Sequence, residues 1–240
     1  MTALNGSNEI VDLDLPAVVT APQYFGVYPA TVVDNQDPDG QGRVQVRLPW
    51  SPDDGGDGAD RYEVWARLAT LMAGAGRGTW FVPETGDEVL VAFHGGDPRW
   101  PYVVGALWNG RDDAPESINA DNDIRSITSR SGITVTFDDT AGAVALTLET
   151  PGGQRVELSD GGSTITVEDS SGNSVELAPG GITVTSSGPL SVSAPTAKLD
   201  VGTLTVTAGM STFSGVVQVD TLISNAVVSA SYTPGVGNVW

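Results

Sequence analysis

The chain has 240 residues, no cysteine and a formal net charge of −19, with 30 Asp and Glu against 11 Lys and Arg. This acidity repels phosphate backbones, so we expect no nucleic-acid partner. The lack of cysteine excludes disulfides and thiolate metal sites, and no apolar stretch approaches the ~20 residues that span a bilayer. Residues 1–10 have neither a basic start nor an apolar centre, so we also expect no signal peptide.

Basic and aromatic residues divide the chain into two unlike halves. Eight of the eleven basic residues and five of the six tryptophans lie in the first 125 positions. This distribution predicts a compact front domain with a core that contains the tryptophans. The remainder is rich in Val, Ile, Leu, Thr, Ser and Gly, which is typical of strands joined by tight turns.

The front half predicts a small barrel. We assign residues 1–23 to an N-terminal extension and residues 24–108 to a domain of about five strands, at 26–33, 43–48, 63–67, 88–93 and 102–107. Turns rich in Gly, Asp and Pro separate these strands, and no segment has a helical period. Closing such a sheet removes its exposed edges, so we expect an antiparallel barrel. A polar linker follows at residues 109–127.

The back half repeats one small unit, in which two apolar residues alternate with polar ones before a polar turn. A strand this short buries too little to stand alone, so either copies stack in a solenoid or several chains wind together. The repeat by itself leaves both arrangements open. The pairs are Ile133/Val135, Leu146/Leu148, Val156/Leu158, Ile165/Val167, Val175/Leu177, Ile182/Val184, Leu190/Val192, Leu199/Val201 and Leu204/Val206.

Several motifs in a fixed order carry a family resemblance. They are VDNQDPDGQGRVQV at 33–46 before Pro49-Trp50, WAR at 65–67, MAGAGRG at 72–78, FVPETGDEVLV at 81–91, GDP at 96–98, PYVVG at 101–105, and SRSG at 129–132 leading into TFDDT at 136–140. Together they resemble the phage baseplate assembly protein V family and related spikes of contractile injection systems.

The resemblance implies an all-β chain: an N-terminal OB-fold barrel that docks on a hub (24–108), an intertwined triple-stranded β-helix (128–207) and an apolar tip segment (208–240), in a parallel homotrimer. It implies a structural central spike, assembled in the cytoplasm of the producing cell within the baseplate of a phage tail or tail-like particle. Such a spike docks on a hub protein and punctures the target envelope, with transient membrane contact. Arg43, Arg67 and Arg77 are expected hub contacts, and Val239 and Trp240 are the expected seat of a PAAR-type tip protein.

Other candidate sites are weaker. His94 ends a predicted strand and has no nucleophile at a suggestive spacing, so we interpret it as an ordinary strand-end residue. The Asp53, Asp54, Asp57 and Asp60 loop lacks EF-hand spacing, and the glycines at 74, 76 and 78 precede no helix that would complete a phosphate cradle. We therefore expect no catalytic residue, metal or cofactor.

Two other functions stay open from the residues. A β-helical glycan-binding adhesin or tailspike-like module fits the repeat, although the repeat turns lack the Trp and Tyr that stack on sugars. A polysaccharide-cleaving enzyme fits less well, because no pair of carboxylates stands out for acid and base chemistry.

Overall fold

The computed structural model describes residues 3–4, 10–11, 23–50 and 62–229. The described residues form strands and one 3-10 turn, η1 (His94–Gly96), and the short strands β1 (Ala3–Leu4) and β2 (Ile10–Val11) pair with each other. No helix among the described residues is long and apolar enough to cross a membrane. The chain divides into two units, Met1–Pro189 and Leu190–Trp240.

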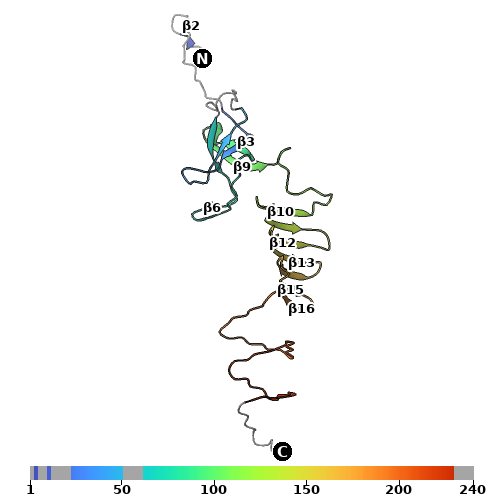
Figure 1. The fold of residues 1–240 in the computed structure, drawn as a ribbon. Coiled ribbons are helices and arrows are strands. Elements are labelled where there is room, and N and C mark those ends of the chain that lie inside the picture. The colour runs from blue at the N-terminus through green and yellow to red at the C-terminus, as the bar shows by residue number, and fades with distance from the viewer. Residues whose placement is uncertain (1–2, 5–9, 12–22, 51–61, 230–240) are drawn as a thin grey trace, which may run out of the picture. The chain divides into compact units, whose positions relative to one another are not determined.

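Five strands of the front half close into a barrel (Figure 1). They are β3 (Val27–Asp34), β4 (Val44–Arg47), β5 (Glu63–Leu68), β8 (Glu88–Phe93) and β9 (Pro101–Leu107), in the order β3-β4-β5-β9-β8. Neighbours are antiparallel except β5 and β9, which run parallel. This is a five-stranded OB-type barrel, and the predicted barrel strands are confirmed to within one residue at each end.

The barrel core consists of aliphatic side chains. Leu48, Val32, Val44, Val46, Val89 and Val91 are the largest side chains that the structure buries completely. They alternate with solvent-facing residues, as β4 and β8 illustrate, because successive side chains of a strand point to opposite faces. The expectation of a tryptophan core is wrong. Trp50, Trp80, Trp100 and Trp108 are exposed and Trp65 is half-buried, since a barrel of this size is filled by Val and Leu.

A small hairpin projects between β5 and β8. Its strands are β6 (Ala73–Gly74) and β7 (Arg77–Gly78), and every residue in both is exposed. Gly78 is required where it stands, because a Cβ at this position would lie 2.6 Å from the backbone oxygen of Met72. We call residues 69–81 the arm.

Seven short strands of the back half form one antiparallel sheet, in which each strand pairs with the next along the chain (Figure 1). We call this sheet the ladder. Each strand has five residues, and the bounds are β10 (Ile124–Thr128), β11 (Thr134–Asp138), β12 (Ala145–Glu149), β13 (Arg155–Ser159), β14 (Thr164–Glu168), β15 (Ser174–Ala178) and β16 (Gly181–Thr185).

Side-chain hydrogen bonds stabilise the tight turns of the ladder. Between β14 and β15, the carboxylate of Asp169 accepts from the backbone N–H groups of Ser171 and Asn173 and from the Asn173 side-chain amide. These bonds lower the pKa of Asp169, and the bond from the Asn173 side chain has the largest effect. Gly172 completes the turn with φ +85°, a conformation that favours glycine. Such turns fix which residues stand opposite each other in the next pair of strands.

The ladder register aligns the apolar residues in two columns on one face. One column is Ile127, Val135, Leu148, Val156, Val167, Val175 and Val184, and the other is Arg125, Phe137, Leu146, Leu158, Ile165, Leu177 and Ile182. The predicted pairs from Leu146/Leu148 to Ile182/Val184 are confirmed. The first pair is corrected to Val135/Phe137, because β11 begins at Thr134 and Ile133 belongs to the turn before it.

The second unit has a different character. Over residues 190–229 the structure has no strand, and every residue is exposed. Figure 1 draws this stretch as open turns of chain without arrows. The predicted pairs Leu190/Val192, Leu199/Val201 and Leu204/Val206 therefore have no strand partner within the described chain.

Candidate assembly surfaces

The two apolar columns of the ladder form a face that nothing in the described chain covers. The buried core of the described residues lies entirely in the barrel, between Ala30 and Val103. Column residues such as Leu158, Ile165 and Val167 remain 41 to 47% exposed even though their cross-strand neighbours are in place. A continuous apolar surface of this kind marks a site of association.

The opposite face of the ladder is polar. Its central column reads Ser126, Thr136, Thr147, Glu157, Thr166, Glu176 and Thr183. Arg155 lies beside this column, where it forms ion pairs with Glu157 and Glu168. One face of the sheet is therefore suited to water and the other to a protein partner.

Residues 190–229 also expose large apolar side chains. Leu199, Val206, Phe213 and Leu222 are each between 64 and 74% exposed. No backbone–backbone hydrogen bond joins any residue of the described stretch 190–228. Extended backbone with unpaired N–H and C=O groups is a template for pairing with another chain.

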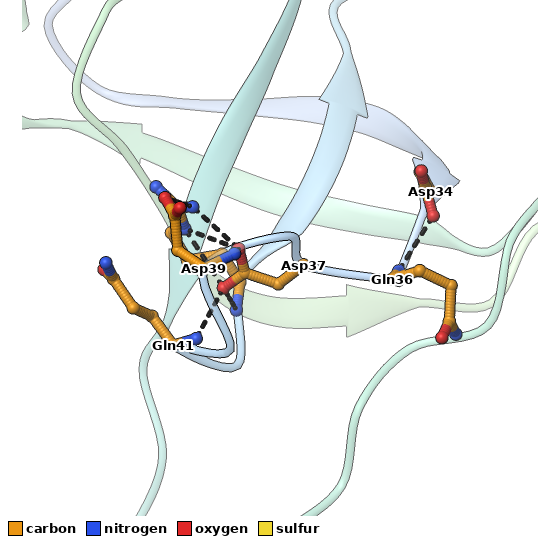
Figure 2. Close-up of polar contacts among 6 residues, drawn as sticks. Asp34, Gln36, Asp37, Asp39 and Gln41 are labelled. Carbon is orange, nitrogen blue, oxygen red and sulfur yellow. Dashed lines mark hydrogen bonds and ion pairs between the residues drawn. The ribbon is translucent and has the colours of Figure 1, made fainter.

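On the barrel, Arg43 forms its ion pairs within the turn between β3 and β4. The Asp37 carboxylate, whose side chain is only 4% exposed, accepts from Arg43 Nη2 at 2.7 Å and from the backbone N–H groups of Asp39 and Gln41 (Figure 2). Arg43 also contacts Asp39 and lies over the Trp65 ring. Its guanidinium holds the pKa of Asp37 far below the usual range, against the opposing effect of burial. Arg43 therefore stabilises the β3–β4 turn.

Arg67 and Arg77 differ from the other cations. Within the described residues, every other Arg and the single Lys form an ion pair with an Asp or Glu. Arg67 lies over the Tyr102 ring, 5.8 Å from its centroid. Arg77 lies on the exposed strand β7, where its guanidinium packs beside Gly74. Of the three predicted hub contacts, these two keep their charge available to a partner.

The arm also carries large exposed apolar side chains that the sequence reasoning missed. Leu71 is 97% exposed and Trp80 is 75% exposed, with Met72 and Phe81 beside them. The Thr70 and Thr79 side chains hydrogen-bond across the arm, so its two sides are held together. Bulky apolar residues that directly flank a Gly-rich turn were the available signal, but composition favoured a core position for all front-half tryptophans.

The remaining candidates have ordinary roles or lie outside the described residues. His94 Nδ1 lies 3.2 Å from the Tyr102 hydroxyl at the end of β8. Among the described residues no group of three or more His, Asp or Glu side chains is arranged to hold a metal. Gly74 and Gly78 lie in β6 and β7, and Gly76 lies in the turn between them, with φ +65°. Asp53, Asp54, Asp57, Asp60, Val239 and Trp240 are outside the described residues.

Comparison with protein families assigns both halves. Residues 28–108 match the type VI secretion system and phage-baseplate injector OB domain, and residues 145–207 match the phage baseplate V C-terminal trimerisation domain. The first match coincides with the closed barrel, and the second begins at β12 and continues past the last ladder strand.

Two curated relatives are named as spike proteins. The type VI secretion system spike protein VgrG3 of Vibrio cholerae serotype O1 is 35% identical over 101 residues, which cover 40% of this chain and 10% of that protein. VgrG4b of Pseudomonas aeruginosa, also a type VI spike protein, is 38% identical over 89 residues, 37% of this chain and 11% of that protein. The matched region thus spans about a tenth of each relative. The chain belongs to the phage-baseplate V and type VI secretion spike family.

Proposed function

We propose that the chain is the central spike of a contractile tail or injection machine and acts as a homotrimer. The observation that carries this proposal is the uncovered apolar face of the ladder. Three copies that turn these faces toward a common axis bury them, as the match to a trimerisation domain supports. Covering the exposed part of one Leu or Ile is worth roughly 1–2 kcal/mol at ~25 cal/mol per Å², and the columns repeat this gain at each strand in every chain.

A trimer of this kind is stiff, and stiffness is the property that a puncturing device needs. Its outer surface is the polar column of Thr, Ser and Glu, so the shaft stays hydrated while its axis is dry. The segment that follows the ladder pairs with its two partner chains, which satisfies the backbone groups that are unpaired in one chain. The spike acts mechanically and crosses the target membrane when the machine contracts, without making or breaking a covalent bond.

The test is the mass in solution of two variants that place the same charge on opposite faces of β14. Ile165→Lys puts a cation in an apolar column, and Thr166→Lys puts it between Glu157 and Glu176 on the polar face. Light scattering should give about three times the chain mass of 24.8 kDa for the wild type and for Thr166→Lys. Ile165→Lys should fall apart or aggregate, because three buried ammonium groups have no partner.

A wild-type protein that is monomeric at all concentrations contradicts the proposal. So does an Ile165→Lys variant that forms the same trimer as Thr166→Lys with the same thermal stability. Either result means that the apolar columns do not meet around an axis.

For the barrel we propose docking on the hub protein of the same machine. Arg67 and Arg77 carry the available positive charge, and the arm adds Leu71 and Trp80 as exposed apolar anchors. Aromatic and Arg side chains together are typical of the residues that dominate binding energy at interfaces. Arg43 contributes indirectly, because it holds the β3–β4 turn against Asp37.

At the other end we propose a PAAR-type tip protein seated on Val239 and Trp240. The support is the sequence: residues 208–240 contain one charged residue, Asp220, and end in Val-Trp. Deletion of Val239 and Trp240 should leave the trimer intact and abolish retention of a co-expressed tip protein in a pull-down. Unchanged retention contradicts this part alone. We also propose that the particle assembles in the cytoplasm of the producing cell.

A further inference from the structure

A single charged residue interrupts the two apolar columns, and it stands at their first position. Arg125 lies on β10, the edge strand of the ladder, directly across from Phe137. Its Nη1 atom is 2.5 Å from Oδ2 of Asp139. Asp139 is the first residue after β11 and continues its pairing with the β10 side, because its backbone N–H donates to the Asp123 carbonyl. Both side chains are more than half exposed, at 56% and 57%.

We propose that the Arg125–Asp139 ion pair fixes the axial register of the three chains in the spike. This inference rests on the proposed homotrimer. When the chains are in register, the three ion pairs lie at the same height, at the open end of the apolar columns beside the edge strand. Water reaches them there, so their charges keep most of their hydration.

The apolar columns alone specify this register poorly. Val135, Leu148, Val156 and Val167 follow one another in one column, and their side chains differ little in size. Sliding one chain along the axis therefore exchanges one aliphatic contact for another. Exchanges between aliphatic side chains of similar volume cost little, so these contacts separate the two registers only weakly.

A slip moves the ion pair into the apolar axis. Successive ladder strands run in opposite directions. A chain that slips by one strand would therefore place its strands opposite strands of the reverse direction in its neighbours. The smallest slip that keeps strand directions matched moves one chain by two strands, on the order of 10 Å. Arg125 of the slipped chain then lies at the same level along the axis as Leu146 and Leu148 of the neighbouring chain. The guanidinium and the carboxylate lose their water and gain only apolar neighbours, which is strongly unfavourable. A polar group at one position of an apolar seam is an established way to set register.

The chain offers a matched control for charge removal. Arg155 also forms ion pairs in the ladder, with Glu157 and Glu168, but on the polar face. Its replacement removes the same charge and the same kind of ion pair without touching the columns. The lack of native cysteine makes engineered disulfides unambiguous.

The experiment co-expresses two full-length chains that differ by a mass tag, one with Val135→Cys and the other with Val156→Cys. These two positions belong to one column and lie two strands apart. After mild oxidation, a mixed disulfide that joins the introduced thiols of the two different chains reports a two-strand slip. Same-position disulfides, between chains with the same substitution, report the aligned trimer. Non-reducing gels and mass spectrometry separate the products.

With Arg125 and Asp139 in place, we expect only same-position disulfides, and the same result for Arg155→Leu. In the double variant Arg125→Leu, Asp139→Leu, the mixed disulfide should rise clearly above its wild-type background. If that variant aggregates, Arg125→Met with Asp139→Asn removes both charges with closer shapes and should give the mixed product. The exchanged pair Arg125→Asp, Asp139→Arg should keep the wild-type pattern.

Same-position disulfides alone in both neutral variants, with the trimer mass retained, overturn the register assignment and leave the proposed spike intact. A mixed product as abundant in the wild type overturns it as well. A wild-type protein that is monomeric by light scattering removes the homotrimer itself, and the register assignment falls with it.

Discussion

Leu158 lies directly across the ladder from Ile165, yet the two keep 42% and 41% of their surface exposed. Neighbours in one sheet cover only each other's flanks, so the tops of both side chains need a second layer. If partner chains supply that layer, truncation leaves a cavity at the axis of the trimer. We expect Leu158→Ala to lower stability by about 2–4 kcal/mol per chain, as for buried leucine. Thr166→Ala on the polar face should change it by less than about 0.5 kcal/mol.

The measurement is the thermal midpoint of the assembled protein at fixed concentration. A Leu158→Ala midpoint equal to that of Thr166→Ala would show that this face remains in water.

Amide hydrogen exchange should distinguish the segment 190–228 in the monomer from the same segment in the spike. In one chain these amides lack any backbone partner within the described residues, so they should exchange within seconds. In the trimer, interchain pairing should slow them by several orders of magnitude, as for core strands. Mass spectrometry of peptic peptides resolves the segment. If these amides exchange fast in a protein that has the mass of a trimer, residues 190–228 do not pair between chains.

The barrel strands could be predicted from the sequence because local signals agreed. The strand at 88–93 is a short apolar run, EVLVAF, bounded by the turn residues Gly86-Asp87 and Gly95-Gly96, and its bounds match the prediction. Asp37 and Gly42 mark the β3–β4 turn, which the structure closes with the Asp37 carboxylate. What composition did not reveal was which large side chains are inside. A closed five-stranded barrel has room for Val and Leu, and Trp80, Trp100 and Trp108 are left at its surface.

The candidate surfaces could be predicted in part. The spacing of apolar pairs predicted one apolar face for the ladder, and the register confirms it from Leu146 onward. The apolar pairs beyond Thr185 have the same spacing, but they form no strand within one chain. Periodicity reports which residues share a face and contains no information on whether the hydrogen-bond partner belongs to the same chain. The ion pair between Arg43 and Asp37 could not be predicted either, because a turn motif does not reveal which side chain its carboxylate contacts.

Truncation of the barrel core should destabilise the barrel specifically. Leu48 is 1% exposed, so Leu48→Ala should cost about 2–5 kcal/mol. Val27→Ala is the control in the adjacent strand β3, and it should cost little because Val27 is exposed. Urea unfolding followed by tryptophan fluorescence reports the barrel domain, because five of the six tryptophans lie within residues 24–108. Equal midpoints for the two variants would contradict the assigned core.

The unpaired charge on the arm should matter for hub binding. Arg77→Gln removes a cation that has no carboxylate partner among the described residues, and we expect hub affinity to fall about tenfold or more, as for an interface Arg. Arg99→Gln is the control, because Arg99 is also exposed but already paired with Asp97. Biolayer interferometry with the purified hub protein measures both. Loss of affinity with Arg99→Gln but not with Arg77→Gln would move the docking surface away from the arm.

The Asp37–Arg43 pair predicts a dependence of barrel stability on pH. The Arg43 side chain, and then the backbone N–H groups, hold the pKa of Asp37 below its usual value, so the folded state favours the ionised carboxylate. This contribution is therefore complete above the ordinary Asp pKa of about 3.9 and is lost as the pH falls below it. Asp37→Asn should lower the urea midpoint of the barrel at pH 7, and the difference from wild type should shrink between about pH 4 and pH 2. Asp39→Asn, at an exposed carboxylate that also contacts Arg43, should have a smaller effect. A difference between wild type and Asp37→Asn that grows on acidification would mean that the turn does not depend on the ionised form.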